Sequence, residues 1–189
     1  MKKLAILVSG RGTNMQHIFQ AISNGKLSNF KVDLVISDRQ CIAIQYAEAL
    51  KENIQTISLE KVKKRFLSKE IHNFLLEKIP DIIVLSGFLS ILDAEFCEKW
   101  NGKIINIHPS LLPKYGGKGM YGMRVHQEVI KNKEKISGAT VHYVTKSIDS
   151  GNIILKKSCR ISSQETPISL SKKISIIEEE ILIKSLNSF

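Results

Sequence analysis

The sequence predicts a Rossmann-like α/β fold: a mainly parallel, twisted sheet with helices on both faces. Short apolar runs alternate with segments of helical periodicity, and such βαβ alternation implies parallel strands joined by crossover helices. The run Asp81–Leu85 is apolar after its first residue, as in a strand buried on both faces. No low-complexity linker divides the 189 residues. We therefore expect a single domain over residues 1–189.

In the first half of the chain, strands are expected at Lys2–Val8, Val32–Ser37, Ile54–Ile57 and Asp81–Leu85. A glycine turn and a helix follow the first strand, because apolar residues recur at helical spacing before Gly25, at Met15, Ile18, Phe19 and Ile22. Two further helices are expected at Ala43–Lys51 and Phe66–Ile79. Pro80 stops the second of them.

In the second half, Asp93 is a candidate N-cap for a helix that reaches Trp100. A loop rich in proline and glycine spans His108–Gly122, and Pro167 suits the first position of the last helix. The remaining expected elements are the strand Lys103–Ile107, the helix Val125–Asn132, and the strands Thr140–Thr145 and Ile153–Arg160.

The net charge of +10 raises the question of nucleic-acid binding. The lysines are scattered through nearly every segment, which favours a compositional bias over a nucleic-acid surface. The densest basic run, Lys61–Arg65, is either a solvated segment or a site for an anionic ligand. No uncharged apolar run reaches the ~20 residues that span a bilayer. We expect a cytoplasmic protein with small-molecule substrates, no nucleic-acid partner and no membrane association.

The segment Ser9–Asn14 lies between the first strand and the first helix. Glycines at this position let backbone amides approach an anion at the helix N-terminus, so a phosphate is the natural ligand. The segment lacks the third glycine of a dinucleotide fingerprint and the Lys-Ser/Thr ending of a P-loop. A plain tight turn stays open as the alternative.

The segment Asn106–Pro113 carries more information. The strand period of two places Asn106 and His108 on one face, roughly 6–7 Å apart, and Pro109 ends the strand. At the carboxyl edge of a parallel sheet, a carboxamide and an imidazole could stabilise an oxyanion and move a proton. The alternative is a capped strand end with a satisfied histidine.

The other polar candidates are less specific. Asp149 precedes Ser-Gly, a common turn sequence, after the strand that carries His142. The remaining histidines form no His-x-x-x-His pair, and the three cysteines are far apart, so we expect no metal site.

Four motifs together resemble the folate-dependent phosphoribosylglycinamide formyltransferases, over nearly the whole chain. They are Ser9–Asn14, Leu85–Phe88, Asn106–Tyr115 and Gly138–Asp149. The resemblance implies the formyltransferase fold, with a phosphate-binding N-terminal half and a catalytic, folate-binding C-terminal half. It also implies that a formyl group moves from 10-formyltetrahydrofolate, a co-substrate, to the amine of 5′-phosphoribosylglycinamide, without a metal.

The resemblance also implies roles for individual residues. Asn106 and His108 are similar to the pair that holds and protonates the formyl oxygen, and Asp149 to the carboxylate that keeps the histidine charged. His142 is similar to a histidine of the family that lies next to these catalytic groups without touching the substrates. The residues implied in ribotide binding are Gly12, Thr13, Asn14 and Glu178, and those implied in folate binding are Lys64, Leu89, Ser90, Ile91, Leu92 and Asn106.

The chain departs from the family pattern at several positions. Ser90 replaces a basic residue, Lys64 replaces an arginine, the segment 116–124 is longer than in some relatives, and the usual His and Pro do not follow Glu178–Glu180. Rival interpretations are a methionyl-tRNA formyltransferase, which normally has an extra C-terminal domain, a formyltetrahydrofolate hydrolase, which usually has an N-terminal one, and a non-catalytic nucleotide sensor. We expect a monomer or a weak homodimer.

Overall fold

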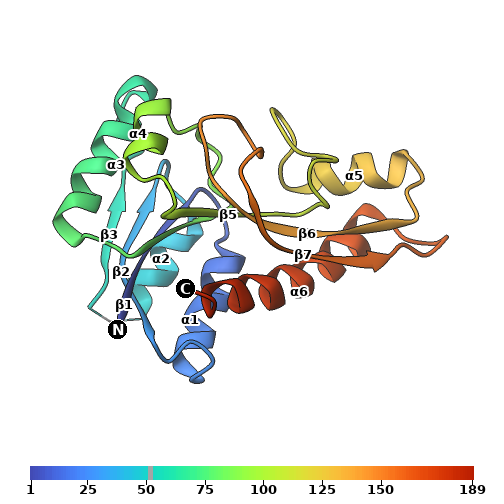
Figure 1. The fold of residues 1–189 in the computed structure, drawn as a ribbon, viewed down its shortest axis with the longest axis horizontal. Helices are drawn as coiled ribbons and strands as arrows, with labels where there is room; N and C mark the ends of the chain where they lie inside the picture. Colours follow the sequence, from blue (N-terminus) through green and yellow to red (C-terminus); the bar gives the residue numbers. More distant parts are fainter. Residues whose placement is uncertain (51–52) are drawn as a thin grey trace. The chain divides into compact units, whose positions relative to one another are not determined.

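The computed structural model describes residues 1–50 and 53–189, and it shows the predicted α/β class. The strands are hydrogen-bonded in the order β3-β2-β1-β4-β5-β6-β7. Along the chain, the elements are β1 (Lys2–Val8), α1 (Thr13–Ser23), β2 (Phe30–Ser37), α2 (Ile42–Ala49), β3 (Gln55–Ser58), α3 (Lys64–Lys78), β4 (Ile82–Ser86), α4 (Ala94–Lys99), β5 (Ile104–His108), α5 (Met123–Lys131), β6 (Ile136–Tyr143), β7 (Ile153–Arg160) and α6 (Pro167–Leu186) (Figure 1).

Each predicted strand and helix is present, with small shifts at the ends. The largest shift is in β6, which begins at Ile136 rather than at Thr140. Glycine usually weakens a strand, but a Cβ at Gly138 would lie 2.1 Å from the Lys157 carbonyl oxygen. Only glycine therefore lets β7 approach β6 at this position. Lys51, the predicted last residue of the second helix, lies outside the described residues.

The chain divides into two compact units, and the first comprises Met1–Ile105. Its strand β1 pairs in parallel with β2 and with β4, and β2 pairs in parallel with β3. The carboxyl ends of these four strands therefore share one edge. Right-handed crossovers place α1 and α2 on one face of the strands and α3 on the other (Figure 1).

The core of the first unit is built from apolar strands and amphipathic helices. The segments Leu4–Val8 and Ile82–Leu85 are buried, which agrees with strands covered on both faces. In α1, Met15, Ile18 and Phe19 are buried at helical spacing. Asp93 caps α4, because its carboxylate accepts a hydrogen bond from the Phe96 amide at 2.8 Å.

The second unit comprises Asn106–Phe189. Its strands β6 and β7 pair antiparallel, and α6 packs along them and against α5 (Figure 1). Thr166 and Ser169 form a capping box at the start of α6, with Pro167 in the first turn. The buried stripe of α6 follows a helical period and consists of Leu170, Ile174, Ile177, Ile181, Leu182 and Leu186.

Candidate active site

The polar side chains of the second unit converge near the carboxyl end of β5. Asn106 is half-buried and His108 is buried, and the strand ends at His108 because proline follows it. Both project from alternate positions of one strand, as the sequence predicts. His142 on β6 and Asp149 on the following loop join them.

A chain of hydrogen bonds orients the Asn106 carboxamide. The Nδ1 atom of His142 lies 2.8 Å from the Tyr143 carbonyl oxygen, which can only accept, so Nδ1 carries the proton. The Nε2 atom of His142 then accepts from the Asn106 Nδ2 amide at 3.1 Å. This assignment leaves the second N–H of Asn106 available to a ligand.

The environment of His142 favours this tautomer. Burial holds the pKa of His142 below its ordinary value, against the Tyr143 carbonyl and the Asp149 charge, which both raise it. At neutral pH the imidazole is therefore uncharged, and Nε2 keeps the lone pair that accepts from Asn106. His142 therefore holds the Asn106 carboxamide in one orientation.

His108 lies between a backbone carbonyl and a carboxylate. Its Nε2 atom donates to the Tyr115 carbonyl oxygen at 2.8 Å. Its Nδ1 atom lies 3.6 Å from Asp149 Oδ2. An imidazolium here would direct both N–H groups at acceptors, which suits a group that holds and releases a proton.

Asp149 is fixed by the loop around it. Its φ of 52° is in the left-handed region, and Oδ2 accepts from the Gly117 amide at 2.8 Å. The other oxygen, Oδ1, lies 3.6 Å from His142 Nε2, so one carboxylate faces both histidines. Neither the Gly117 amide nor the Tyr115 carbonyl was predicted, because backbone groups leave no residue-type signal in the sequence.

A third histidine of this unit, His126, lies on α5. It is 5% exposed, and its Nδ1 atom has no hydrogen-bond partner among the described residues. Burial, together with the positive charge of His108, lowers the pKa of His126 to about 4. His126 is therefore a neutral, buried neighbour of His108 that sequence reasoning placed only on a helix.

The predicted phosphate loop lies in the first unit, at the carboxyl end of β1. Gly12 has φ 70°, and a Cβ there would lie 2.7 Å from Ala43 Cβ, so the turn requires glycine. It is the N-cap of α1 without a side-chain cap, which leaves the first-turn amides open. Thr13 begins the helix, and the Oδ1 atom of Asn14 is buried without a hydrogen-bond partner in the described structure. The open amides and the glycine fit an anion, whereas Asn14 Oδ1 can only accept a hydrogen bond.

The predicted folate segment follows β4 in the same unit. Leu89 and Ile91 are exposed at 42% and 66%, whereas Leu92 is buried. The Ser90 hydroxyl donates to Asp38 Oδ2 at 2.5 Å, and Asp38 also accepts from the Arg39 guanidinium.

Although burial raises the pKa of Asp38, hydrogen bonds from Arg39, Ser90 and Ser9 hold it below its usual value. The Ser90 side chain thus fixes the loop, while two apolar side chains face outward.

The remaining predicted residues are less tightly grouped. Lys64 is an exposed first residue of α3, and Glu178 is half-buried on α6. In residues 1–50 and 53–189, no group of three or more His, Cys, Asp or Glu side chains is arranged to hold a metal ion. Within the same ranges, no helix is long and apolar enough to cross a membrane.

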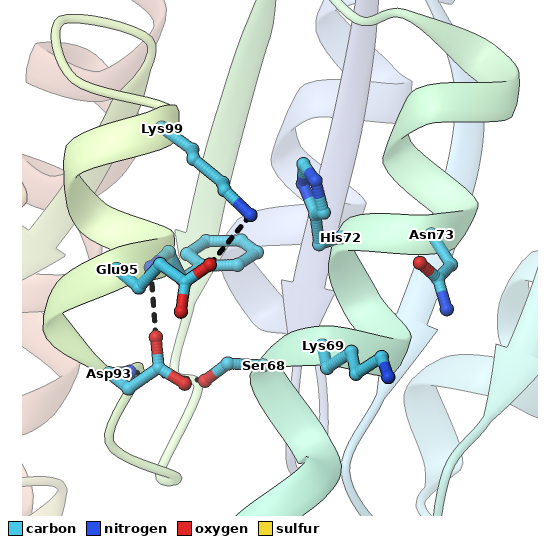
Figure 2. Close-up of a pocket in the computed structure, with 8 residues that line it drawn as sticks. Ser68, Lys69, His72, Asn73, Asp93, Glu95 and Lys99 are labelled. Atoms are coloured by element: carbon cyan, nitrogen blue, oxygen red, sulfur yellow. Dashed lines mark hydrogen bonds and ion pairs between the residues drawn. The ribbon is translucent and has the colours of Figure 1, made fainter.

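A separate pocket of about 360 Å³ lies between α3 and α4. Within its lining, Lys99 pairs with Glu95 at 2.8 Å and the Ser68 hydroxyl accepts from the Asp93 amide at 3.1 Å, while His72 accepts at 3.0 Å from the indole of Trp100, a residue outside the lining. We assign it to the packing of the two helices. Figure 2 shows its lining, which comprises Ser68, Lys69, His72, Asn73, Asp93, Glu95, Phe96 and Lys99.

A carboxamide, an imidazole and a carboxylate at a strand end are groups that can stabilise an oxyanion and move a proton, as in enzymes of group transfer. Residues 2–186 match the formyl transferase family, and the chain belongs to this family. It is 35% identical over 171 residues to a phosphoribosylglycinamide formyltransferase of Haemophilus influenzae, covering 88% of this chain and 76% of the relative.

Two further similar proteins are also phosphoribosylglycinamide formyltransferases. A chloroplastic phosphoribosylglycinamide formyltransferase of Arabidopsis thaliana is 32% identical over 187 residues, which is 97% of this chain but 63% of that protein. The chain therefore spans less than two thirds of this relative. A phosphoribosylglycinamide formyltransferase structure from Anaplasma phagocytophilum has a TM-score of 0.86 at 32% identity, covering 97% of this chain and 84% of that one.

Proposed function

We propose that this protein transfers the formyl group of 10-formyltetrahydrofolate to the amine of 5′-phosphoribosylglycinamide, a step of purine synthesis. The observation that carries the proposal is the cluster of Asn106, His142, Asp149 and His108: Asn106 donates to His142, and the Asp149 carboxylate lies 3.6 Å from a ring nitrogen of each histidine. This cluster offers a neutral donor and a proton carrier in one place. Membership of the formyl transferase family and the names of the relatives support the same chemistry.

In the first step, the substrate amine attacks the formyl carbon and a new C–N bond forms. Negative charge then collects on the formyl oxygen. The second N–H of Asn106 can donate to this oxygen, because His142 already holds the first one and fixes the plane of the amide. Pre-orientation of this donor lowers the cost of reaching the charged intermediate.

In the second step, the bond between the formyl carbon and the folate nitrogen breaks. The amine must lose one proton and the folate nitrogen must gain one, so the reaction needs a proton carrier and no net acid or base. His108 can release a proton from Nδ1 and take one back, with Asp149 at 3.6 Å to stabilise the charged form.

The first unit supplies features that suit both substrates. The open amides at the start of α1 fit the ribotide phosphate, and Gly12 lets the backbone approach it. Leu89 and Ile91 present apolar surface that suits the flat ring system of the folate. Because the Ser90 hydroxyl is bonded to Asp38, we propose that this residue contacts the folate through its backbone.

The test is steady-state kinetics of formyl transfer with Asn106→Ala, His108→Ala and Asp149→Asn. Each should lower kcat by roughly 10²–10⁴ with little change in either KM, because the lost groups act on the intermediate. Asn101→Ala, in an exposed turn, is the matched control and should keep wild-type turnover. Near wild-type kcat for His108→Ala or Asn106→Ala would refute this assignment.

A further inference from the structure

The bond between His108 and the Tyr115 carbonyl depends on an uncommon backbone conformation. Tyr115 has φ 56°, in the left-handed region that is unfavourable for an L-residue. Other contacts must therefore hold Tyr115 in place. Its carbonyl oxygen lies 2.8 Å from His108 Nε2, so any relaxation of this backbone would change the hydrogen bond of the proposed proton carrier.

Glu134 makes a hydrogen bond to the Tyr115 side chain, which also interacts with Asn132. Glu134 lies in the turn after α5, and its Oε1 atom accepts from the Tyr115 hydroxyl at 3.0 Å and from Lys114 Nζ at 3.0 Å. Hydrogen bonds from Lys114 and Tyr115 hold the pKa of the Glu134 carboxyl below its usual range. The carboxylate is therefore ionised at neutral pH and remains an acceptor.

The backbone on both sides of Tyr115 is also tied down. The Ser110 hydroxyl donates to the Lys114 carbonyl at 2.6 Å, and the Gly117 amide donates to Asp149. A Cβ at Gly116 would lie 2.5 Å from Leu112 Cδ2, so this loop has little room to shift. Within this frame, the hydroxyl bond to Glu134 ties the Tyr115 side chain itself to the rest of the unit.

The two groups that donate to Glu134 differ in how strongly water screens their hydrogen bonds. The Lys114 side chain is 70% exposed, and an exposed ion pair contributes little to stability. The Tyr115 side chain is half-buried, and the Glu134 side chain is 26% exposed, so their hydrogen bond is better shielded from water. Substitution of Lys114 is therefore a control for loss of the Lys114–Glu134 ion pair. The hydrogen bond from Tyr115 is the contact through which Glu134 affects the backbone near His108.

We propose that Glu134 is a positioning residue for His108, acting through the Tyr115 hydroxyl to keep the Tyr115 carbonyl on His108 Nε2. This inference rests on the proposed function. Because the hydrogen bond to the Tyr115 carbonyl keeps one proton on His108 Nε2, the proton that moves during the reaction is the one on Nδ1, which faces Asp149. Loss of Glu134 lets the imidazole change tautomer or rotate, and fewer molecules then hold the proton where the reaction needs it.

The kinetic test compares Glu134→Ala, Glu134→Gln and Tyr115→Phe. Glu134→Ala and Tyr115→Phe should each lower kcat roughly 5- to 50-fold and leave both KM values within about threefold. Glu134→Gln keeps an acceptor oxygen and should retain kcat within about threefold of wild type. Lys114→Met removes only the exposed donor and should leave kcat within about twofold.

A double-mutant cycle tests whether the two residues act as one unit. Because Glu134 acts through Tyr115, the kcat of the variant with both Glu134→Ala and Tyr115→Phe should be no lower than that of the less active single variant. Multiplied losses would show that the residues act separately and would overturn the proposal.

Nitrogen-15 NMR of His108 gives a readout that general loss of stability would not move. At a pH where the ring is neutral, the wild-type protein should hold its proton on Nε2, whereas Glu134→Ala and Tyr115→Phe should show a mixture of both tautomers. An unchanged proton position with wild-type kcat would overturn the proposal. The spectrum needs no turnover, so it tests Glu134 even if the substrate assignment fails, and the nearly isosteric Tyr115→Phe serves if Glu134→Ala does not fold.

Discussion

Replacement of His126 by leucine should make the protein more resistant to acid. The folded-state pKa of His126 is about 4, because burial and the nearby charge of His108 oppose protonation, and the ordinary value is 6.5. Between these values the unfolded chain binds a proton that the folded chain does not, so stability is lost as the pH falls. His126→Leu removes this difference, and no hydrogen bond to Nδ1 is lost.

The expected size follows from the two pKa values. Each pKa unit corresponds to about 1.4 kcal/mol, so preferential protonation of His126 in the unfolded chain lowers the free energy of unfolding by about 2 kcal/mol at pH 5 and about 3 kcal/mol at pH 4. Urea unfolding of both proteins from pH 4 to pH 8 gives the difference in unfolding free energy directly. Other titrating groups are common to both proteins and cancel. If the difference in unfolding free energy between the two proteins changes by less than about 0.5 kcal/mol from pH 8 to pH 4, the assignment of a buried neutral His126 is refuted.

Three other perturbations test separate parts of the structure. Gly12→Val should raise KM for the ribotide by roughly tenfold or more with a nearly unchanged KM for folate, since a Cβ at Gly12 meets Ala43 at 2.7 Å; weakened folate binding alone would place the phosphate elsewhere. Gly151→Ala should lower the free energy of unfolding in urea by about 2 kcal/mol or more, because its Cβ would lie 1.9 Å from the Tyr143 carbonyl oxygen that fixes His142; wild-type stability would contradict this contact. Exhaustive chelation should leave turnover intact, and a loss that zinc or magnesium restores would show a metal requirement.

Much of the fold could be predicted because local pattern determines it. The uniformly apolar run at Ile82–Leu85 is a strand buried on both faces, and the helical spacing from Met15 to Phe19 is the buried face of α1. The predicted start of β6 at Thr140 was wrong, because the strand begins at Ile136 and includes Gly138, a residue type that usually weakens a strand. The actual role of Gly138, close approach of Lys157, depends on a strand nineteen residues further along the chain.

In the candidate site, too, local pattern predicts some features, and contacts between distant residues determine the others. The side-chain period of two is enough to predict that Asn106 and His108 share one face of β5. The orientation of His108, however, depends on the Tyr115 carbonyl, and a backbone group has no signature in residue type. The bond of Ser90 to Asp38 joins residues 52 positions apart, and local sequence patterns do not encode such pairs. Pattern therefore predicted that the two candidate side chains share one face of a strand, and tertiary packing decided their hydrogen bonds.

The most direct measurement is the fate of a carbon-13-labelled formyl group on 10-formyltetrahydrofolate, followed by NMR with each acceptor in turn. Formyl transfer by this chain predicts rapid consumption only with 5′-phosphoribosylglycinamide, with one formylated glycinamide formed per folate consumed. Unphosphorylated glycinamide should react poorly, because under the proposed function the Gly12 loop binds the phosphate and so aligns the amine. Rapid release of labelled formate without an acceptor, or label on charged tRNA, would contradict the proposed function, and no consumption under any condition would indicate a protein without this activity.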